Sequence, residues 1–177
     1  MADETKAVDF DRTFLPHMDA AYNLARWLVR DDHDAQDVVQ EAYLRAVRFA
    51  AGFRGGDSRA WILAIVRNTA YTWLKRNRIS HSSTEFDEQL HGGSTEESGL
   101  DAEAVREADG AMIRAALEEL ADEFREVIVM RDIEGLSYKE IADAADIPLG
   151  TVMSRLARAR AKLAHSLKDR IAKERQS

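Results

Sequence analysis

Basic side chains near the carboxyl end of the chain have the types and spacing of a helix that binds nucleic acid. In the stretch GTVMSRLARARAKL (150–163), apolar residues at intervals of four, three and four form one face: Val152, Leu156, Ala159 and Leu163. The other side is predicted to carry Ser154, Arg155, Arg158 and Lys162. An arginine can form two parallel hydrogen bonds with a guanine edge, and cations neutralise phosphates. The spacing therefore indicates a helix that contacts DNA.

The residues before this helix predict a second, shorter helix and a sharp turn. Ser137 and Glu140 fit a capping box, in which each side chain accepts from the other residue's backbone N–H. This predicts a helix over 138–145, which Pro148 ends because proline has no N–H and restricts the residue before it. Two helices with this turn are typical of a helix-turn-helix. A basic helix alone would also fit a solvated surface, but the combination favours DNA contact.

A second group of polar side chains lies in DAQDVVQEAYLRAVR (34–48). One helical face, opposite Val38 and Ala42, is predicted to carry Asp37, Gln40, Glu41 and Leu44. Carboxylates on one face suit a basic protein surface. Taken alone, the pattern fits an ordinary acidic helix face better.

A third group lies in FRGGDSRAWILAIVRNTAYTWLKRNR (53–78), which is dense in aromatic residues and has a basic end. Opening a DNA duplex needs pockets for unstacked bases and cations for the phosphates of the single strand. Trp61 is predicted to lie largely in the core. Asn68 and the run from Lys75 to Arg78 are the better candidates for contact with DNA.

The elements that must position these residues are helices. Apolar periodicity predicts three helices in the first half: one over 10–30, one from Asp34, as its cap, to about 50, and one over 59–77 with Ser58 as its cap. Helical periodicity resumes near 101, with an apolar stripe at Ala116, Leu117, Leu120, Phe124, Val127 and Ile128. Between the halves, residues 79–100 hold five Ser, two Thr, three Gly and five acids, which predicts a flexible, acidic linker.

Charge is segregated along the 177 residues. Residues 1–79 hold 12 Lys/Arg and 11 Asp/Glu. Residues 80–148 hold 5 Lys/Arg and 19 Asp/Glu, and residues 149–177 hold 8 and 2.

The absence of cysteine excludes disulfides and cysteine-ligated zinc, and the five histidines show no metal-ligand spacing. The polar start MADETKAVDF is no secretory signal, and no apolar run could cross a membrane. We therefore expect a cytoplasmic protein without cofactor or membrane insertion.

These motifs resemble a known family. EGLSYKEIADAADIPLGTVMSRLARARAKL (134–163) is similar to the DNA-binding module of bacterial sigma factors, above all the extracytoplasmic-function (ECF) group. Residues 34–48 resemble the sigma segment that grips the clamp coiled coil of RNA polymerase. Residues 53–78 resemble the promoter-melting segment, through F-R-G, Trp61, Arg67-Asn68 and the basic end. The order and size of both segments fit the family over nearly the whole chain.

The resemblance implies an all-α fold of two small helical domains joined by a flexible acidic linker. Region 2 would span 8–79, the linker 80–105 and the region 4 helix-turn-helix 106–177. In the family, such a linker threads toward the active-centre and RNA-exit channels of polymerase.

The resemblance also implies a transcription initiation factor without enzymatic activity of its own. Its partners would be core RNA polymerase (clamp coiled coil and flap), promoter DNA and an inhibitory anti-sigma factor. Contacts with polymerase would come from Asp37, Gln40, Glu41 and Leu44. The minus-ten element would be met by Arg54, Asn68, Tyr71, Lys75 and Arg76. The minus-thirty-five element would be met by Thr151, Met153, Ser154, Arg155, Ala157, Arg158 and Lys162.

Two positions depart from the family's usual residues. Met153 stands where the family often has a basic residue, and Ala157 where it often has a larger one. Both side chains can touch a thymine methyl group but cannot hydrogen-bond a base.

Two other functions remain compatible with parts of the chain. One alternative function is a helix-turn-helix regulator that works without polymerase, although 10–78 resembles neither a sensing nor a dimerisation domain. The other is a sigma-like mimic that titrates an anti-sigma factor, although mimics usually carry a receiver domain.

Overall fold

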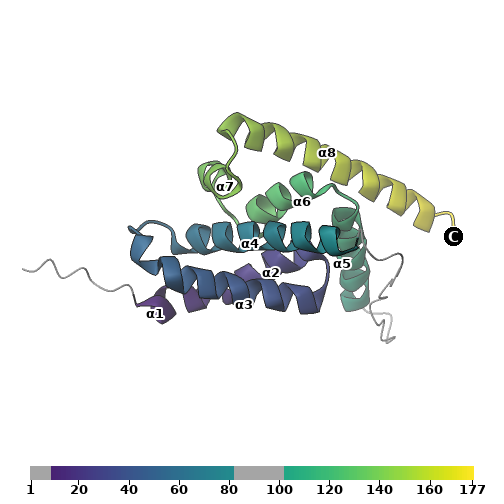
Figure 1. The fold of residues 1–177 in the computed structure, drawn as a ribbon. Helices are drawn as coiled ribbons and strands as arrows, with labels where there is room; N and C mark the ends of the chain where they lie inside the picture. The colour runs from purple at the N-terminus through teal and green to yellow at the C-terminus, as the bar shows by residue number, and fades with distance from the viewer. Residues whose placement is uncertain (1–8, 82–101) are drawn as a thin grey trace, which may run out of the picture.

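The computed structural model describes residues 9–81 and 102–177, and within these ranges the chain is helical with no β-strand. This confirms the predicted all-α class (Figure 1). The elements are α1 (Phe10–Phe14), η1 (Leu15–His17), α2 (Met18–Val29), α3 (Asp32–Phe49), η2 (Ala50–Gly52), α4 (Ser58–His81), α5 (Ala102–Glu118), α6 (Asp122–Ile128), η3 (Val129–Ile133), α7 (Tyr138–Ala145) and α8 (Leu149–Glu174). We call residues 9–81 the N-terminal module and residues 102–177 the C-terminal module.

In the N-terminal module, α2, α3 and α4 pack against one another around a buried apolar core. The single helix predicted over 10–30 is wrong, because the chain forms α1, a 3-10 turn with Pro16 in its first turn, and then α2. Proline has no N–H to donate to the preceding turn, so a continuous helix is disfavoured there. Phe14, fully buried at this break, anchors the module's end.

Two helix caps differ from the predicted ones. Asp31, not Asp34, caps α3 by accepting from the backbone N–H groups of His33 and Asp34. Asp57, not Ser58, accepts from the backbone N–H groups of Arg59 and Ala60 at 2.9 and 3.2 Å. In both cases the donors are two and three residues after the aspartate, the spacing of an N-cap. The Ser58 hydroxyl instead lies 2.9 Å from Nε2 of His17 and ties α4 to η1.

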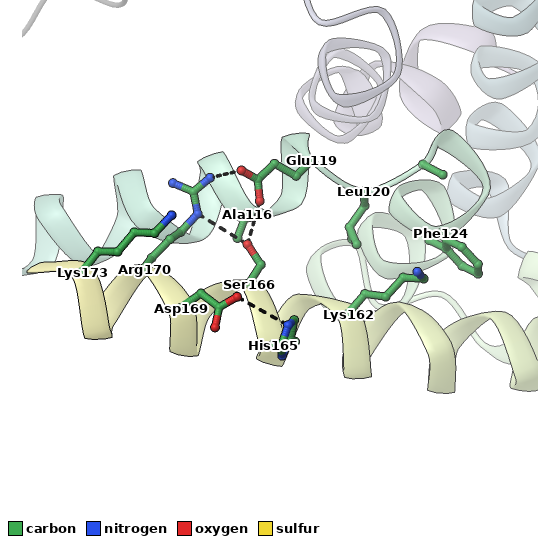
Figure 2. Close-up of a pocket in the computed structure, with 11 residues that line it drawn as sticks. Ala116, Glu119, Leu120, Phe124, Lys162, His165, Ser166, Asp169, Arg170 and Lys173 are labelled. Atoms are coloured by element: carbon green, nitrogen blue, oxygen red, sulfur yellow. Dashed lines mark hydrogen bonds and ion pairs between the residues drawn. The ribbon is translucent and has the colours of Figure 1, made fainter.

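In the C-terminal module, α6 and α7 pack against the first half of α8, and α5 packs along its second half. The predicted apolar stripe is confirmed, since Ala116, Leu117, Leu120, Val127 and Ile128 are buried and Phe124 is half-buried. Figure 2 shows the contact of α5 with α8, where the Ser166 hydroxyl donates to Glu119 at 2.7 Å and Arg170 pairs with the same carboxylate. Helix α8 is one helix of 26 residues, and these contacts join its second half to α5.

The predicted linker, 80–105, is helical at both ends. Helix α4 continues to His81, and α5 begins at Ala102. The predicted flexibility concerns mainly 82–101, which lie outside the described residues.

The two modules pack against each other. Helix α4 packs against α7, and α2 packs against α6 and η3, so that α6, α7 and α8 lie on the side of α4 away from α3 (Figure 1). Buried apolar residues of both modules belong to one contiguous cluster. Within 9–81 and 102–177, none of the helices has both the length and the apolar character that a bilayer crossing requires.

Candidate nucleic-acid interface

Helices α7 and α8 form the predicted helix-turn-helix. The capping box is confirmed: the Glu140 N–H donates to Ser137 Oγ at 3.1 Å, and the Ser137 N–H donates to Glu140 Oε2 at 2.7 Å. Asp146 ends α7 with a left-handed φ of 53°, and Pro148 precedes α8 in extended conformation. Val152, Leu156 and Ala159 are buried against the module, so the rest of this part of α8 faces outward.

The outward side of α8 combines apolar and basic side chains. Met153 is 53% exposed, and Ser154, Ala157 and Arg158 are also exposed. Thr151 is half-buried, and its carbonyl accepts from the Ser154 hydroxyl at 3.1 Å. A base edge that met this side would contact a methionine and an alanine, with the guanidinium of Arg158 beside them.

The sequence predicted that Arg155 lies on the outward side. In the structure its side chain turns toward α6 instead. Its side chain is 23% exposed, and its guanidinium lies 3.6 Å from Glu123 and 3.7 Å from Glu126. The reason is position: Arg155 is three residues after Val152 and four before Ala159, so it borders the buried stripe. Lys162 also bends back, with its ammonium 5.6 Å from the ring centre of Phe124.

Helix α4 carries the predicted strand-opening residues on two sides. Asn68, Lys75 and Arg76 are exposed. Tyr71 is half-buried, and the Arg67 guanidinium lies 4.5 Å from its ring centre. Burial, followed by the nearby charge of Glu126, raises the pKa of Tyr71. Tyr71 therefore faces the C-terminal module as a neutral phenol, whereas the other three face solvent.

The loop before α4 is shaped by glycine and held by aromatic packing. Gly55 and Gly56 have φ values of 88° and 97°, which side chains rarely adopt. Next to them Arg54 is exposed. Phe53 and Trp61 pack on Phe14 with ring centres 5.4 and 4.8 Å away. Trp61 thus packs against the core, as predicted, and helps to hold the loop that presents Arg54.

Helix α3 presents the predicted acidic face to solvent. Asp37 and Gln40 are exposed, and Leu44 is 57% exposed. Glu41 is half-buried and pairs with Arg45 at 2.5 Å. Beside these residues runs a groove between α2 and α3, lined mainly by Leu15, Met18, Tyr22, Val39, Tyr43, Leu44 and Val47. This side joins exposed apolar side chains to a row of polar ones, a composition typical of a protein-binding surface.

Comparison with known proteins identifies the family of both modules. Residues 13–79 match the family model of sigma-70 region 2, and residues 110–163 match that of sigma-70 region 4. The RNA polymerase sigma-H factor of Pseudomonas aeruginosa is 34% identical over 159 residues, which cover 85% of this chain and 82% of that protein. The chain belongs to the sigma-70 family of RNA polymerase sigma factors.

Other relatives carry the name of the extracytoplasmic-function (ECF) group, to which this sigma factor belongs. The ECF sigma factor SigE of Mycolicibacterium smegmatis is 32% identical, with 91% of this chain aligned to 62% of that protein. The ECF sigma-E factor of Escherichia coli is 35% identical, with 72% of this chain aligned to 70% of that protein. The chain therefore spans less than two thirds of the mycobacterial relative.

Two solved structures resemble the fold of this sigma factor. One is the sigma factor RpoE in complex with the anti-sigma factor NepR from Bartonella quintana, with a TM-score of 0.72, 27% identity and coverage of 90% of this chain and 97% of that one. The other is CnrH in complex with the cytosolic domain of CnrY, with a TM-score of 0.62, 26% identity and coverage of 90% and 88%. At 90% coverage the likeness includes both modules.

Sequence reasoning missed the polar residues by which the two modules of this sigma factor meet. Glu126 and Glu134 of the C-terminal module are buried, and their partners include Arg67 and Arg59 of the N-terminal module. One signal was available: Arg125-Glu126 interrupts an otherwise apolar run from Phe124 to Met130. Within 9–81 and 102–177, no three His, Asp or Glu side chains gather as a metal site would require.

Proposed function

We propose that this chain binds core RNA polymerase and directs it to promoters with its own pair of recognition elements. The observation that carries the proposal is the presence of regions 2 and 4 in one chain, in the order that a sigma factor needs. The polymerase supplies the chemistry of RNA synthesis. The chain supplies recognition, so no catalytic residue is assigned to it.

The N-terminal module would bind polymerase through α3. Beside the apolar groove, α3 exposes Asp37, Gln40 and Leu44. The cap at Asp31 fixes the start of this helix. A protein partner gains affinity from apolar contacts in such a groove and orientation from the charged rim. The clamp coiled coil of polymerase is the partner that the family resemblance suggests, and the flap would meet region 4.

The promoter would be bound by both modules. Arg54, Asn68, Lys75 and Arg76 are exposed on or beside α4 and would contact the opened minus-ten element. The outward side of α8, with Met153, Ser154, Ala157 and Arg158, would enter the major groove at the minus-thirty-five element. Thr151 and Lys162, at the edges of this side, would contact phosphates, Lys162 by turning away from Phe124.

An anti-sigma factor would control access to these surfaces. The support is the likeness, over both modules, to a sigma factor in complex with an anti-sigma factor. Such a partner would act by covering the α3 face, the DNA-binding side chains, or both.

The test is transcription in vitro with the purified chain, bacterial core polymerase and fragmented genomic DNA, followed by sequencing of the 5′ ends of the transcripts. We expect discrete start sites that share two upstream sequence elements. Core polymerase binding without starts would favour a sigma-like mimic. DNA binding without polymerase binding would favour a helix-turn-helix regulator, and either result would overturn the proposal.

A further inference from the structure

The outward side of α8 divides into two flanks. Residues four apart lie almost in line along a helix, so Leu149, Met153 and Ala157 form one row, which we call the apolar flank. Leu149 is 50% exposed, and Met153 and Ala157 are exposed as well. The opposite flank carries Arg155 and Arg158. Helix α8 therefore presents aliphatic and thioether groups along one edge and cations along the other.

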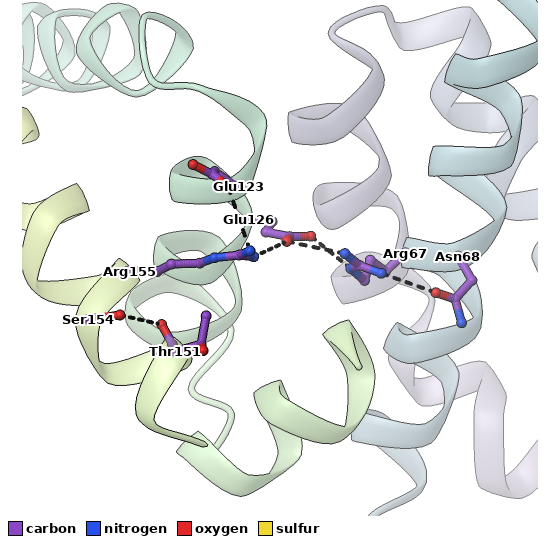
Figure 3. A network of polar contacts seen from close by, with 7 residues as sticks. All are labelled: Arg67, Asn68, Glu123, Glu126, Thr151, Ser154 and Arg155. Atoms are coloured by element: carbon purple, nitrogen blue, oxygen red, sulfur yellow. Dashed lines mark hydrogen bonds and ion pairs between the residues drawn. The ribbon is translucent and has the colours of Figure 1, made fainter. Parts of the chain in front are cut away.

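The cationic flank offers bases fewer free donors than its sequence suggests. Figure 3 shows Arg155 turned toward α6 of the same module, where its guanidinium lies 3.6 Å from Glu123. The Ser154 hydroxyl donates to the Thr151 carbonyl at 3.1 Å, so its oxygen is left to act as an acceptor. Arg158 is exposed and can meet a guanine edge. The first two turns of α8 are therefore better suited to apolar contacts with bases than to guanine recognition.

Neither the packing nor the backbone of the chain requires a glycine at position 150. Gly150 lies in the first turn of α8, and its φ is not in the left-handed region. A Cβ atom added there would meet no atom within 4 Å beyond its chain neighbours and its own helix backbone. Glycine destabilises a helix relative to alanine, but it lets another molecule approach the backbone closely. A partner that comes close to this turn would therefore explain the glycine.

We propose that the apolar flank of α8 selects thymine methyl groups in the minus-thirty-five element, with Leu149 as a contact residue and Gly150 as the point of closest approach. This rests on the proposed function, because it names the class of DNA that α8 would bind. In a helix-turn-helix the N-terminal residues of the second helix lie nearest the base edges. Among the four bases, thymine alone presents a methyl group in the major groove. Aliphatic side chains shield that group from water, which favours binding.

The length of the apolar flank sets the extent of the element. From Leu149 to Ala157 the helix rises about 12 Å, at 1.5 Å per residue. This is the length of about three base-pair steps in DNA. Arg158 directly follows Ala157, so guanine is expected at that end of the element. The inferred element therefore has thymines on about three consecutive base pairs, followed by a guanine.

The experiment begins with selection from a library of random duplexes. The full chain is used both alone, since the outward side of α8 is exposed, and bound to core polymerase. Each thymine of the selected duplex is then replaced in turn by deoxyuridine, which removes only the methyl group. We expect a loss of roughly fourfold in affinity at two or more positions. A selected element without thymine, no enrichment in either form, or no effect of deoxyuridine would overturn the proposal.

The contact residue is tested by comparing Leu149→Ala with Ile171→Ala. Both variants remove an exposed aliphatic side chain from α8, but Ile171 lies in the last turns of the helix, away from the proposed DNA contact. Leu149→Ala should abolish the deoxyuridine effect at one thymine, different from the one affected by Met153→Ala. Ile171→Ala should keep every effect. If Leu149→Ala also keeps every effect, Leu149 does not read the element and the proposal is wrong.

The variant Gly150→Ala separates DNA contact from stability. Alanine favours the helix, so the melting temperature should stay the same or rise. The added methyl group should nevertheless weaken binding of the selected duplex by about fivefold or more, the cost of at least one lost base contact. Unchanged binding would mean that the first turn of α8 does not approach DNA closely, which contradicts the proposal.

The outcomes separate this inference from the proposed function. Selection by the free chain needs neither polymerase nor a known promoter. If a thymine-rich element is selected and deoxyuridine weakens it, but no transcripts start, the proposed function falls and the reading of methyl groups stands. If transcripts start from promoters whose upstream element is insensitive to deoxyuridine, the reverse holds.

Discussion

Met153 lies on the outward side of α8, and its side chain cannot form a hydrogen bond with a base edge. It is 53% exposed on the outward side, with Ala157 one turn further on. A thioether can pack on the 5-methyl group of thymine, which projects into the major groove. Replacing thymine by deoxyuridine in the mapped minus-thirty-five element should therefore weaken binding. The loss of one buried methyl contact is worth about 0.8 kcal/mol, or roughly fourfold in affinity.

The matched control for this prediction is the variant Met153→Ala. Without the long side chain, the same deoxyuridine duplex should bind as well as the thymine duplex. The measurement is the ratio of the two affinities for each protein, taken at one salt concentration. A ratio that is the same for wild type and variant would mean that Met153 does not read the methyl group.

Among single residues, burial was predictable and ion pairing was not. The intervals of four and three in α8 located Val152, Leu156 and Ala159 correctly, because a helix has only one way to bury such a stripe. Arg155 borders that stripe, and its direction was decided by Glu123 and Glu126, which belong to another helix. The sequence carries no local signal for such a pair.

At the scale of the element, α7 depends on its first turn. It has eight residues, too few for a stable isolated helix. The reciprocal hydrogen bonds of Ser137 and Glu140 satisfy two N–H groups that would otherwise lack partners. Ser137→Ala should cost about 1 kcal/mol of the free energy of unfolding. For a chain of this size, thermal unfolding followed by circular dichroism should show a loss of about 2–4 °C.

Ser154→Ala is the control for the cap. This serine is exposed, and its hydroxyl donates to a carbonyl of its own turn. Its removal should change the free energy of unfolding by less than about 0.5 kcal/mol, the usual range for a surface substitution. Equal melting temperatures of the two variants would show that the capping box does not stabilise the C-terminal module.

The helices themselves were predictable where local signals agreed. The capping box and the break at Pro148 gave α7 its observed bounds, 138–145. Where the signals were ambiguous the prediction failed, as at Pro16, where apolar periodicity continued through a residue that cannot donate a backbone hydrogen bond. The caps moved from Asp34 and Ser58 to Asp31 and Asp57, because several neighbouring side chains could have served.

At the scale of the molecule, the contact between the modules could not be predicted. Arg67 and Glu126 are 59 residues apart, and Arg59 and Glu134 are 75 apart. A charged residue within an amphipathic helix is predicted to face solvent, because the sequence does not show a distant partner. Separate modules joined by a flexible linker were predicted, whereas in the structure the modules pack against each other through α2 and α4.

In the whole molecule, the face of α3 that we propose to bind polymerase lies away from the contact between the two modules. Helix α3 lies across α4 from α6, α7 and α8 (Figure 1). The double variant Asp37→Asn with Leu44→Ala removes one exposed acid and one exposed aliphatic side chain from α3. It should weaken binding to core polymerase by at least about tenfold, while binding to a DNA duplex by the free chain stays unchanged.

The control variant removes the same two kinds of side chain from a different helix. Asp169→Asn with Ile171→Ala also removes an exposed acid and an exposed aliphatic side chain, from the last turns of α8. It has the same net charge as the α3 variant, so a general charge effect would appear in both. Polymerase affinity that falls in the α3 variant alone assigns the contact to that face. An equal fall in both, or in neither, would mean that polymerase binds the chain through another surface.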